Sequence, residues 1–123
     1  MAATNNLTWW QGNSDGPLPV PLDPSIDLSN ASIVRWWMAK KVTSIGSDIF
    51  VMKAYPDNGL ALSLSGGVWS VLIDFLPEDT EDVPAGSYYH ECELVDTQDR
   101  VTTLFRGKIR INKVLIPASL DLP

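Results

Sequence analysis

The sequence predicts an all-β protein, an antiparallel β-sandwich, and three observations lead to that fold class. Nine prolines and eight glycines interrupt the chain so often that no window keeps the long periodicity of a core helix. The segments between these breaks are short and rich in Val, Ile, Thr, Trp, Tyr and Phe, the residues enriched in strands. Several segments alternate apolar and polar side chains, as a strand does when only one of its faces is buried.

The length of the chain fits one domain with one hydrophobic core. It has 123 residues, of which 45% are hydrophobic and 20% are charged, an ordinary globular composition. A domain of this size buries roughly two-thirds of the surface that its unfolded chain exposes, so it can be stable without disulfides. We expect the sandwich to occupy residues 1–114 and residues 115–123 to form an extended C-terminal tail.

The first half of the chain contains four predicted strands. Residues 7–11 form a strand that ends at a turn rich in Gly, Asn, Ser and Asp. Residues 17–22 alternate proline with apolar residues; because proline cannot donate a ladder hydrogen bond, they predict an edge strand or an extended arm. Polar side chains over residues 26–31 turn the chain into a strand over residues 32–42, and residues 48–54 form a shorter one. In the strand over 32–42, the side chains expected to share the buried face are Val34, Trp36, Met38 and Val42.

The second half contains two predicted hairpins separated by an acidic crossing. Residues 60–64 and 68–76 are strands joined at Gly66-Gly67, and the second of them is the clearest core strand, with Trp69, Val71, Ile73 and Phe75 on one face. The acidic, proline-bounded segment 77–86 predicts a surface crossing with one helical turn at most. Residues 87–95 and 100–111 pair as a hairpin around a turn at 96–99. The inward face of the last strand is expected to hold Val101, Thr103, Phe105, Ile109 and Ile111, with Gly107 at a bulge or a close backbone approach.

Charge and hydropathy argue against two classes of partner. The net charge of −6 disfavours nucleic acid, because binding a phosphate backbone requires clustered Lys and Arg. Basic residues do concentrate near the end of the chain and predict solvated strand faces or one side of a charge-complementary subunit contact; they are Arg100, Arg106, Lys108, Arg110 and Lys113. The start of the chain lacks the features of a secretory signal, and no apolar run reaches the roughly 18–20 residues of a spanning helix. We expect neither a nucleic-acid nor a membrane partner.

The sequence lacks the common motifs of catalysis and cofactor binding, so we expect a protein that is not an enzyme and holds no cofactor. His90 and Cys92, the only histidine and the only cysteine, lie two residues apart on one strand face. A nucleophile with its base is one interpretation, and a half-buried strand pair is the favoured one, since a free cysteine usually behaves as a small core hydrophobe. The lone thiol fits assembly in a reducing cytoplasm.

A cluster of four carboxylates offers the oxygen ligands that Ca²⁺ prefers; it comprises Glu78, Asp79, Glu81 and Asp82. The cluster lacks the glycine-hinged spacing of a known calcium loop. A solvated acidic loop is therefore the favoured interpretation, and no metal is expected.

Five tryptophans are the compositional oddity of the chain, and four of them form the pairs Trp9-Trp10 and Trp36-Trp37. Adjacent strand residues point to opposite faces, so one indole of each pair can fill the core while the other points outward. An outward indole favours a protein interface or a sugar-stacking site, unless loops of the chain cover it. The apolar tail over residues 115–123 predicts a docking arm or a flexible end. The candidate protein-interface residues are Trp10, Trp37, Pro17, Pro19, Leu115, Ile116, Leu120 and Leu122.

The order of several short motifs resembles a family of small phage tail and baseplate proteins, and is similar to the N-terminal domain of phage baseplate upper proteins. The opening motifs are Leu7-Thr8-Trp9-Trp10-Gln11-Gly12-Asn13, Pro17-Leu18-Pro19-Val20 and Ile26-Asp27-Leu28-Ser29-Asn30-Ala31. The later ones are Pro84-Ala85-Gly86-Ser87-Tyr88-Tyr89-His90-Glu91-Cys92-Glu93-Leu94 and Leu104-Phe105-Arg106-Gly107-Lys108-Ile109. The chain departs from the family at Asn13 and at His90-Glu91-Cys92, and it ends where larger members continue into further modules.

The resemblance implies an immunoglobulin-like or jelly-roll-like sandwich built into a virion, with no catalytic residues to carry over. The expected function is that of a structural bacteriophage protein of a tail, baseplate or fibre-attachment site, made in the bacterial host cytoplasm. It would bind other virion proteins in symmetric copies and form a homo-oligomer in the particle. A capsid decoration protein on the phage head is the first alternative. A carbohydrate-binding module, in which Trp10, Trp37 or Trp69 stacks on sugar rings, is the second.

Overall fold

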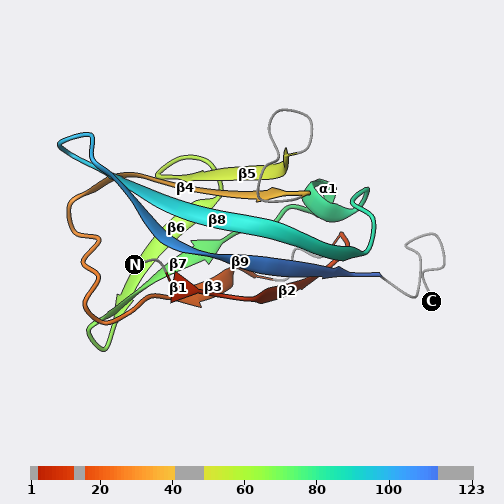
Figure 1. Ribbon diagram of the computed structural model, residues 1–123, viewed down its shortest axis with the longest axis horizontal. Coiled ribbons are helices and arrows are strands. Elements are labelled where there is room, and N and C mark those ends of the chain that lie inside the picture. The colour runs from red at the N-terminus through yellow and green to blue at the C-terminus, as the bar shows by residue number, and fades with distance from the viewer. Residues whose placement is uncertain (1–2, 13–15, 41–48, 114–123) are drawn as a thin grey trace.

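The computed structural model describes residues 3–12, 16–40 and 49–113, which form two β-sheets packed face to face (Figure 1). The strands of the larger sheet are β1 (Ala3–Thr4), β2 (Leu7–Trp10), β4 (Ala31–Ala39), β5 (Ile49–Tyr55), β8 (Gly86–Asp96) and β9 (Val101–Asn112). Their order is β1-β9-β8-β4-β5, and β2 also pairs with β9. The predicted all-β sandwich is confirmed.

The smaller sheet has three strands in the order β3-β7-β6. These strands are β3 (Leu18–Pro21), β6 (Leu60–Ser65) and β7 (Val68–Ile73), and the single-turn helix α1 (Pro77–Thr80) follows them. In Figure 1 the β6–β7 hairpin lies behind the larger sheet, and α1 lies on the path from β7 to β8. Two predictions are thereby confirmed: the proline-rich segment is an edge strand, and the acidic crossing contains one helical turn.

The predicted alternation of side chains holds in the two central strands. On β4, Val34, Trp36 and Met38 are fully buried, whereas the intervening Arg35 is exposed. Along and just beyond β7, the side chains with no exposed surface are Val71, Ile73 and Phe75, with Trp69 half-buried on the same face. Val42, the last member predicted for the β4 face, lies outside the described residues. These two strands supply the facing surfaces of the sandwich.

An aromatic cluster occupies the centre of the core. The Trp9 ring stacks on Phe75 with centroids 4.6 Å apart, and the Trp36 ring meets Phe75 edge-on at 5.6 Å. Such aromatic pairs add to the free energy gained by burying their area. Because Trp9 and Trp36 come from the larger sheet and Phe75 follows β7, the cluster joins the two sheets.

The N-terminal strands run parallel to β9, whereas the other strand pairs of both sheets are antiparallel. In the register of β2 with β9, Trp9 lies opposite Ile111 and Trp10 opposite Asn112. A period-two pattern fixes which side chains are buried but not the direction of the neighbouring strand. The parallel pairing is therefore a feature that the sequence pattern did not predict.

The predicted inward face of β9 is wrong at its first two positions. Val101 is 57% exposed. Thr103 lies opposite Glu93, which is on the outward face of β8, so Thr103 also points away from the core. The register shifts between Cys92 and Glu93, so that Leu104 is buried although it breaks the alternation. Such a bulge reverses the side-chain faces on one side of it. The remaining predicted core positions, Phe105, Ile109 and Ile111, are fully buried.

Gly107 allows the N-terminal segment to cross β9 at close range, as the sequence predicted. A Cβ atom at this position would collide with the backbone carbonyl of Asn5. Two hydrogen bonds to β9 hold the backbone on either side of that carbonyl in place. The Asn5 amide donates to the Arg106 carbonyl at 2.9 Å, and the Asn6 Oδ1 accepts from the Lys108 amide at 3.1 Å. The connection between β1 and β2 is therefore held against the glycine.

Replacing Gly107 with alanine is expected to destabilise the protein by about 2–3 kcal/mol, the cost typical of forcing an extra carbon into a packed site. Urea denaturation of the purified variant measures this change. The matched control is Lys108→Ala on the neighbouring exposed residue, which we expect to change stability by less than about 0.5 kcal/mol. Equal stability of the two variants would contradict the close approach.

Candidate protein-binding surface

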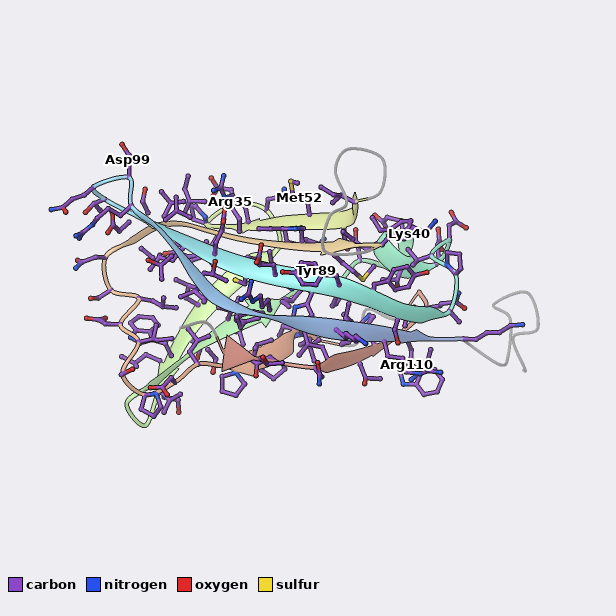
Figure 2. The ribbon with its side chains drawn as sticks, in the orientation of Figure 1. Arg35, Lys40, Met52, Tyr89, Asp99 and Arg110 are labelled. Carbon is purple, nitrogen blue, oxygen red and sulfur yellow. The ribbon has the colours of Figure 1, made fainter. Side chains whose placement is uncertain are left out.

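The outward surface of the larger sheet is the candidate binding surface, and we call it the large-sheet face. Its members point away from the smaller sheet; they are Arg35, Trp37, Met52, Tyr89, Glu91, Glu93, Arg106, Lys108 and Arg110. One cross-strand row runs from Met52 through Trp37 and Glu91 to Arg106. Figure 2 shows this side of the sheet, with the Tyr89 ring lying in front of β8.

An apolar pair lies at the β5 end of that row. Met52 is 58% exposed, and it lies directly opposite the half-buried Trp37 on the neighbouring strand. Opposed side chains on one face of a sheet are close enough to touch. A flexible thioether beside a large indole is typical of protein interfaces, where Trp and Met are enriched.

Charged groups on the neighbouring strands are held by specific partners. The Arg35 guanidinium forms an ion pair with Glu93. The Tyr89 hydroxyl donates a hydrogen bond to Glu91 Oε1 at 2.9 Å. Burial, together with the nearby Glu91 carboxylate, raises the pKa of Tyr89, so the hydroxyl keeps the proton that it donates. The polar side chains of this surface thus have partners on the surface itself.

Positive charge follows the outer side of β9. Arg106, Lys108 and Arg110 alternate along the strand and are all exposed. Residues two apart in a strand lie about 6–7 Å from each other, so the three cations form one row. The row concentrates positive charge in a chain whose net charge is −6, and such a row can complement an acidic surface. The basic residues predicted near the end of the chain thus lie together on one exposed strand face.

The two tryptophan pairs divide as their adjacency predicts. Trp9 and Trp36 are buried, whereas Trp10 is 48% exposed and Trp37 is half-buried on the outward side. Trp10 and Trp37 share the large-sheet side but do not touch. The row of Trp10 contains Asn112 and that of Trp37 contains Arg106, which puts the two indoles about 20 Å apart along the strands. The two indoles therefore lie at separate positions on this side of the sheet.

The other interface candidates lie elsewhere. Pro17 and Pro19 are exposed on the side of the smaller sheet, with Pro19 opposite Leu72, so they face away from the tryptophans. Pro17 also lines a shallow hollow with Pro56, Asp74 and neighbouring residues. The tail candidates, Leu115, Ile116, Leu120 and Leu122, lie outside the described residues.

His90 and Cys92 lie on the inner face of β8, and both are fully buried. The indole N–H of Trp36 donates to His90 Nδ1 at 3.1 Å, so the proton of the neutral ring lies on Nε2, which donates to the Asn5 carbonyl at 2.6 Å. Burial raises the pKa of the Cys92 thiol. The two residues are therefore a strand pair that is fully buried rather than half-buried as predicted: both ring nitrogens are hydrogen-bonded, and burial favours the protonated thiol.

The imidazole of His90 is expected to make stability fall under mildly acidic conditions. Burial lowers the pKa of His90, against a smaller opposing effect of the Asn5 hydrogen bond. The unfolded chain therefore takes up a proton before the folded protein does. Stability is full above the unfolded pKa of about 6.5 and falls as the pH drops toward the folded value, by up to about 1.4 kcal/mol per pH unit.

Urea denaturation at a series of pH values between about 5 and 7.5 measures this slope, a range in which most carboxylates remain ionised. The control is His90→Gln, which lacks a titrating group at this position. It should be less stable than the parent yet show a flatter profile over the same range. An equal slope in both proteins would contradict the assignment to His90.

The four carboxylates of the acidic cluster do not point toward a common site in the structure. Asp79 turns inward to form an ion pair with Lys53, with 2.6 Å between Nζ and Oδ2, whereas Glu78, Glu81 and Asp82 are exposed. In residues 3–12, 16–40 and 49–113, no group of three or more His, Cys, Asp or Glu side chains is placed to share a metal ion. Within these same ranges, no helix has the length and hydropathy needed to cross a bilayer.

Met52 is the surface residue that the sequence reasoning missed. Met52 and Lys53 are adjacent and therefore lie on opposite faces of the strand, and hydropathy alone would place the lysine outside and the methionine inside. The structure shows the reverse, because Asp79 supplies a partner that allows Lys53 to be buried. The hydrophobic pattern alone holds no signal for that pairing.

Comparison of the chain with models of known protein families and with curated protein sequences finds no match.

Proposed function

We propose that this protein is a structural component of a bacteriophage particle, of a tail, baseplate or fibre-attachment site, and that it acts by binding neighbouring virion subunits. The proposal is supported by the motif resemblance over residues 7–114 together with the all-β sandwich fold. Its partners are other virion proteins rather than nucleic acid or membrane, and it is made in the bacterial cytoplasm before assembly.

The observation that carries the binding role is the large-sheet face. Its Met52–Trp37 pair supplies an apolar contact, and the Arg106, Lys108 and Arg110 row supplies positive charge beside it. Interfaces combine an aromatic or apolar anchor with a polar surround that selects the partner. We therefore assign the subunit contact to this face, with an acidic surface on the partner.

The experiment is co-sedimentation of the purified protein with tails and with empty heads separated from a lysate of the encoding phage. We expect binding to tails, and we expect Trp37→Ala with Met52→Ser to weaken it by about tenfold or more, as for a contact that anchors an interface. The matched control is Ser70→Ala, half-buried on the outer side of the smaller sheet. Retention of binding by the double variant would overturn the assignment to this face.

The same experiment separates the alternatives. Binding to heads instead of tails would favour a capsid decoration protein, and binding to neither would overturn the virion proposal. A carbohydrate-binding module needs exposed rings arranged together to stack on successive sugars. Trp10 and Trp37 lie about 20 Å apart along the strands, and Trp69 is half-buried on the other sheet, which disfavours that function.

A further inference from the structure

The two edges of the smaller sheet differ in whether they can accept another strand. The sheet ends at β3 on one side and at β6 on the other. Exposed edges present unpaired amides and carbonyls, and proteins protect such edges with proline or charge. In this sheet only the β3 edge has such protection. The evidence is which amides and carbonyls of each edge strand point outward.

The β6–β7 turn fixes which backbone groups point outward. Both central glycines have positive φ, 57° at Gly66 and 79° at Gly67, as a type I′ turn requires. Ser65 and Val68 then form the hydrogen-bonded pair that closes the hairpin, and the ladder alternates from there. The amides and carbonyls of Leu62 and Leu64 consequently point away from β7, toward the free edge of the sheet.

The same alternation, carried across β7, identifies the outward groups of β3. Leu22 continues the ladder, because its amide donates to the Trp69 carbonyl at 2.9 Å. The even-numbered residues of β3 therefore bond to β7, and Pro19 and Pro21 are the residues whose backbone nitrogen faces outward. Neither has an N–H to donate. The β3 edge is closed to strand pairing.

The β6 edge has neither proline nor charge. Its sequence is Leu-Ala-Leu-Ser-Leu-Ser, and Leu64 is 56% exposed although it lies on the core-facing side of the strand. Its cross-strand neighbour, Trp69, is only half-buried. Among the described residues no strand covers this edge. It is therefore an unprotected edge with an uncovered leucine beside its outward amides.

We propose that β6 pairs with β6 of a second copy of this chain, antiparallel, so that the two smaller sheets join into one. The two-fold axis passes through Ser63: Leu62 lies opposite Leu64 of the other copy in a hydrogen-bonded pair, and Ser63 faces its own counterpart. This register pairs the outward amides and carbonyls of Leu62 and Leu64 in both copies, and it covers the exposed Leu64 with a leucine.

A second copy fits this edge because the edge is self-complementary. An uncharged strand meets its symmetry mate without like-charge repulsion, and a two-fold contact requires one surface to match itself. The starting end of β6 contributes less, because Leu60 is buried and follows the bridge between Ala54 and Gly59. The inference needs no other protein, so it and the proposed virion role can fail separately.

Disulfide trapping tests the register directly. Opposed residues of a non-hydrogen-bonded pair have Cα atoms about 4.5 Å apart, within reach of a disulfide, so Ser63→Cys should cross-link into a dimer under mild oxidation. The control is Ala61→Cys, on the same face of the same strand, whose counterpart in the other copy lies about 13 Å away. The native Cys92 is buried and does not compete. Equal cross-linking of both variants would overturn the register.

Sedimentation equilibrium tests the association itself. We expect a dimer of the unmodified chain that dissociates on dilution, and a monomer at every concentration would overturn the proposal. Leu64→Pro removes the outward N–H and leaves the β6–β7 ladder intact, so it should weaken the dimer by about tenfold or more, because the symmetry removes two hydrogen bonds at once. Leu64→Val keeps the amide and should remain dimeric. Circular dichroism of both variants checks that each is folded, and equal dimerisation of folded Leu64→Pro would also overturn the proposal.

Discussion

Trp36→Ala is expected to remove most of the stability of this protein, with a loss of about 4–8 kcal/mol. Truncation of a fully buried tryptophan costs about 3–5 kcal/mol, because the cavity that it leaves closes only in part. The variant also leaves His90 Nδ1 buried without its donor, which adds about 1–3 kcal/mol. The free energy of unfolding of a small domain is about 5–15 kcal/mol in total, so a large unfolded fraction of the variant is expected in water. Urea denaturation followed by far-ultraviolet circular dichroism measures the loss.

The adjacent residue supplies the matched control for this prediction. Trp37 has the same side chain one position further along β4, but it lies half-buried on the large-sheet face. Trp37→Ala should cost about 1–2 kcal/mol, as expected for partial loss of buried apolar area. Similar losses in the two variants would contradict the assignment of one indole to the core and the other to the surface.

The sequence predicted those parts of the fold that depend on a single local rule, such as side-chain alternation or the missing amide of proline. Alternation placed Trp36 inside and Trp37 outside, and it identified Val71 and Ile73 as core residues of β7. The missing amide of proline confined residues 18–21 to an edge, as the strand order shows. These features follow from local geometry, which depends on neighbouring residues in the chain.

The features that could not be predicted depend on contacts between distant segments. The faces of Val101 and Thr103 are set by a register shift against β8, which no period in β9 reveals. The N-terminal strands pair with β9 across almost the full length of the chain, and a strand pattern does not encode that partner or its direction.

The candidate surface could be predicted only in part, because the positions of its residues also depend on contacts between distant segments. The sequence identified Trp10 and Trp37 as outward, but their separation on the sheet depends on the β2–β9 and β4–β8 registers. Met52 was missed because its exposure follows from the burial of Lys53, which in turn needs Asp79 from α1. Surfaces built across strands become visible only when the pairing is known.

The Lys53–Asp79 pair is the second contact on which the fold strongly depends. Replacing Asp79 should cost more stability than replacing Lys53. Only 7% of the Lys53 side chain is exposed, against 18% for Asp79, and the Asp79 Oδ2 also accepts the Leu76 amide at 2.7 Å. Asp79→Ala leaves a buried ammonium without a partner and should cost about 3 kcal/mol.

Lys53→Met should cost less, about 1–2 kcal/mol, because the remaining carboxylate keeps the Leu76 amide and some solvent. The double variant Lys53→Met/Asp79→Ala has no charge left to bury, so it should be at least about 1 kcal/mol more stable than the sum of the two single losses predicts. Urea denaturation of the four proteins of this cycle at neutral pH measures the coupling. Additive losses would mean that the ion pair does not hold α1 against β5, and that Lys53 is buried for its aliphatic stem alone.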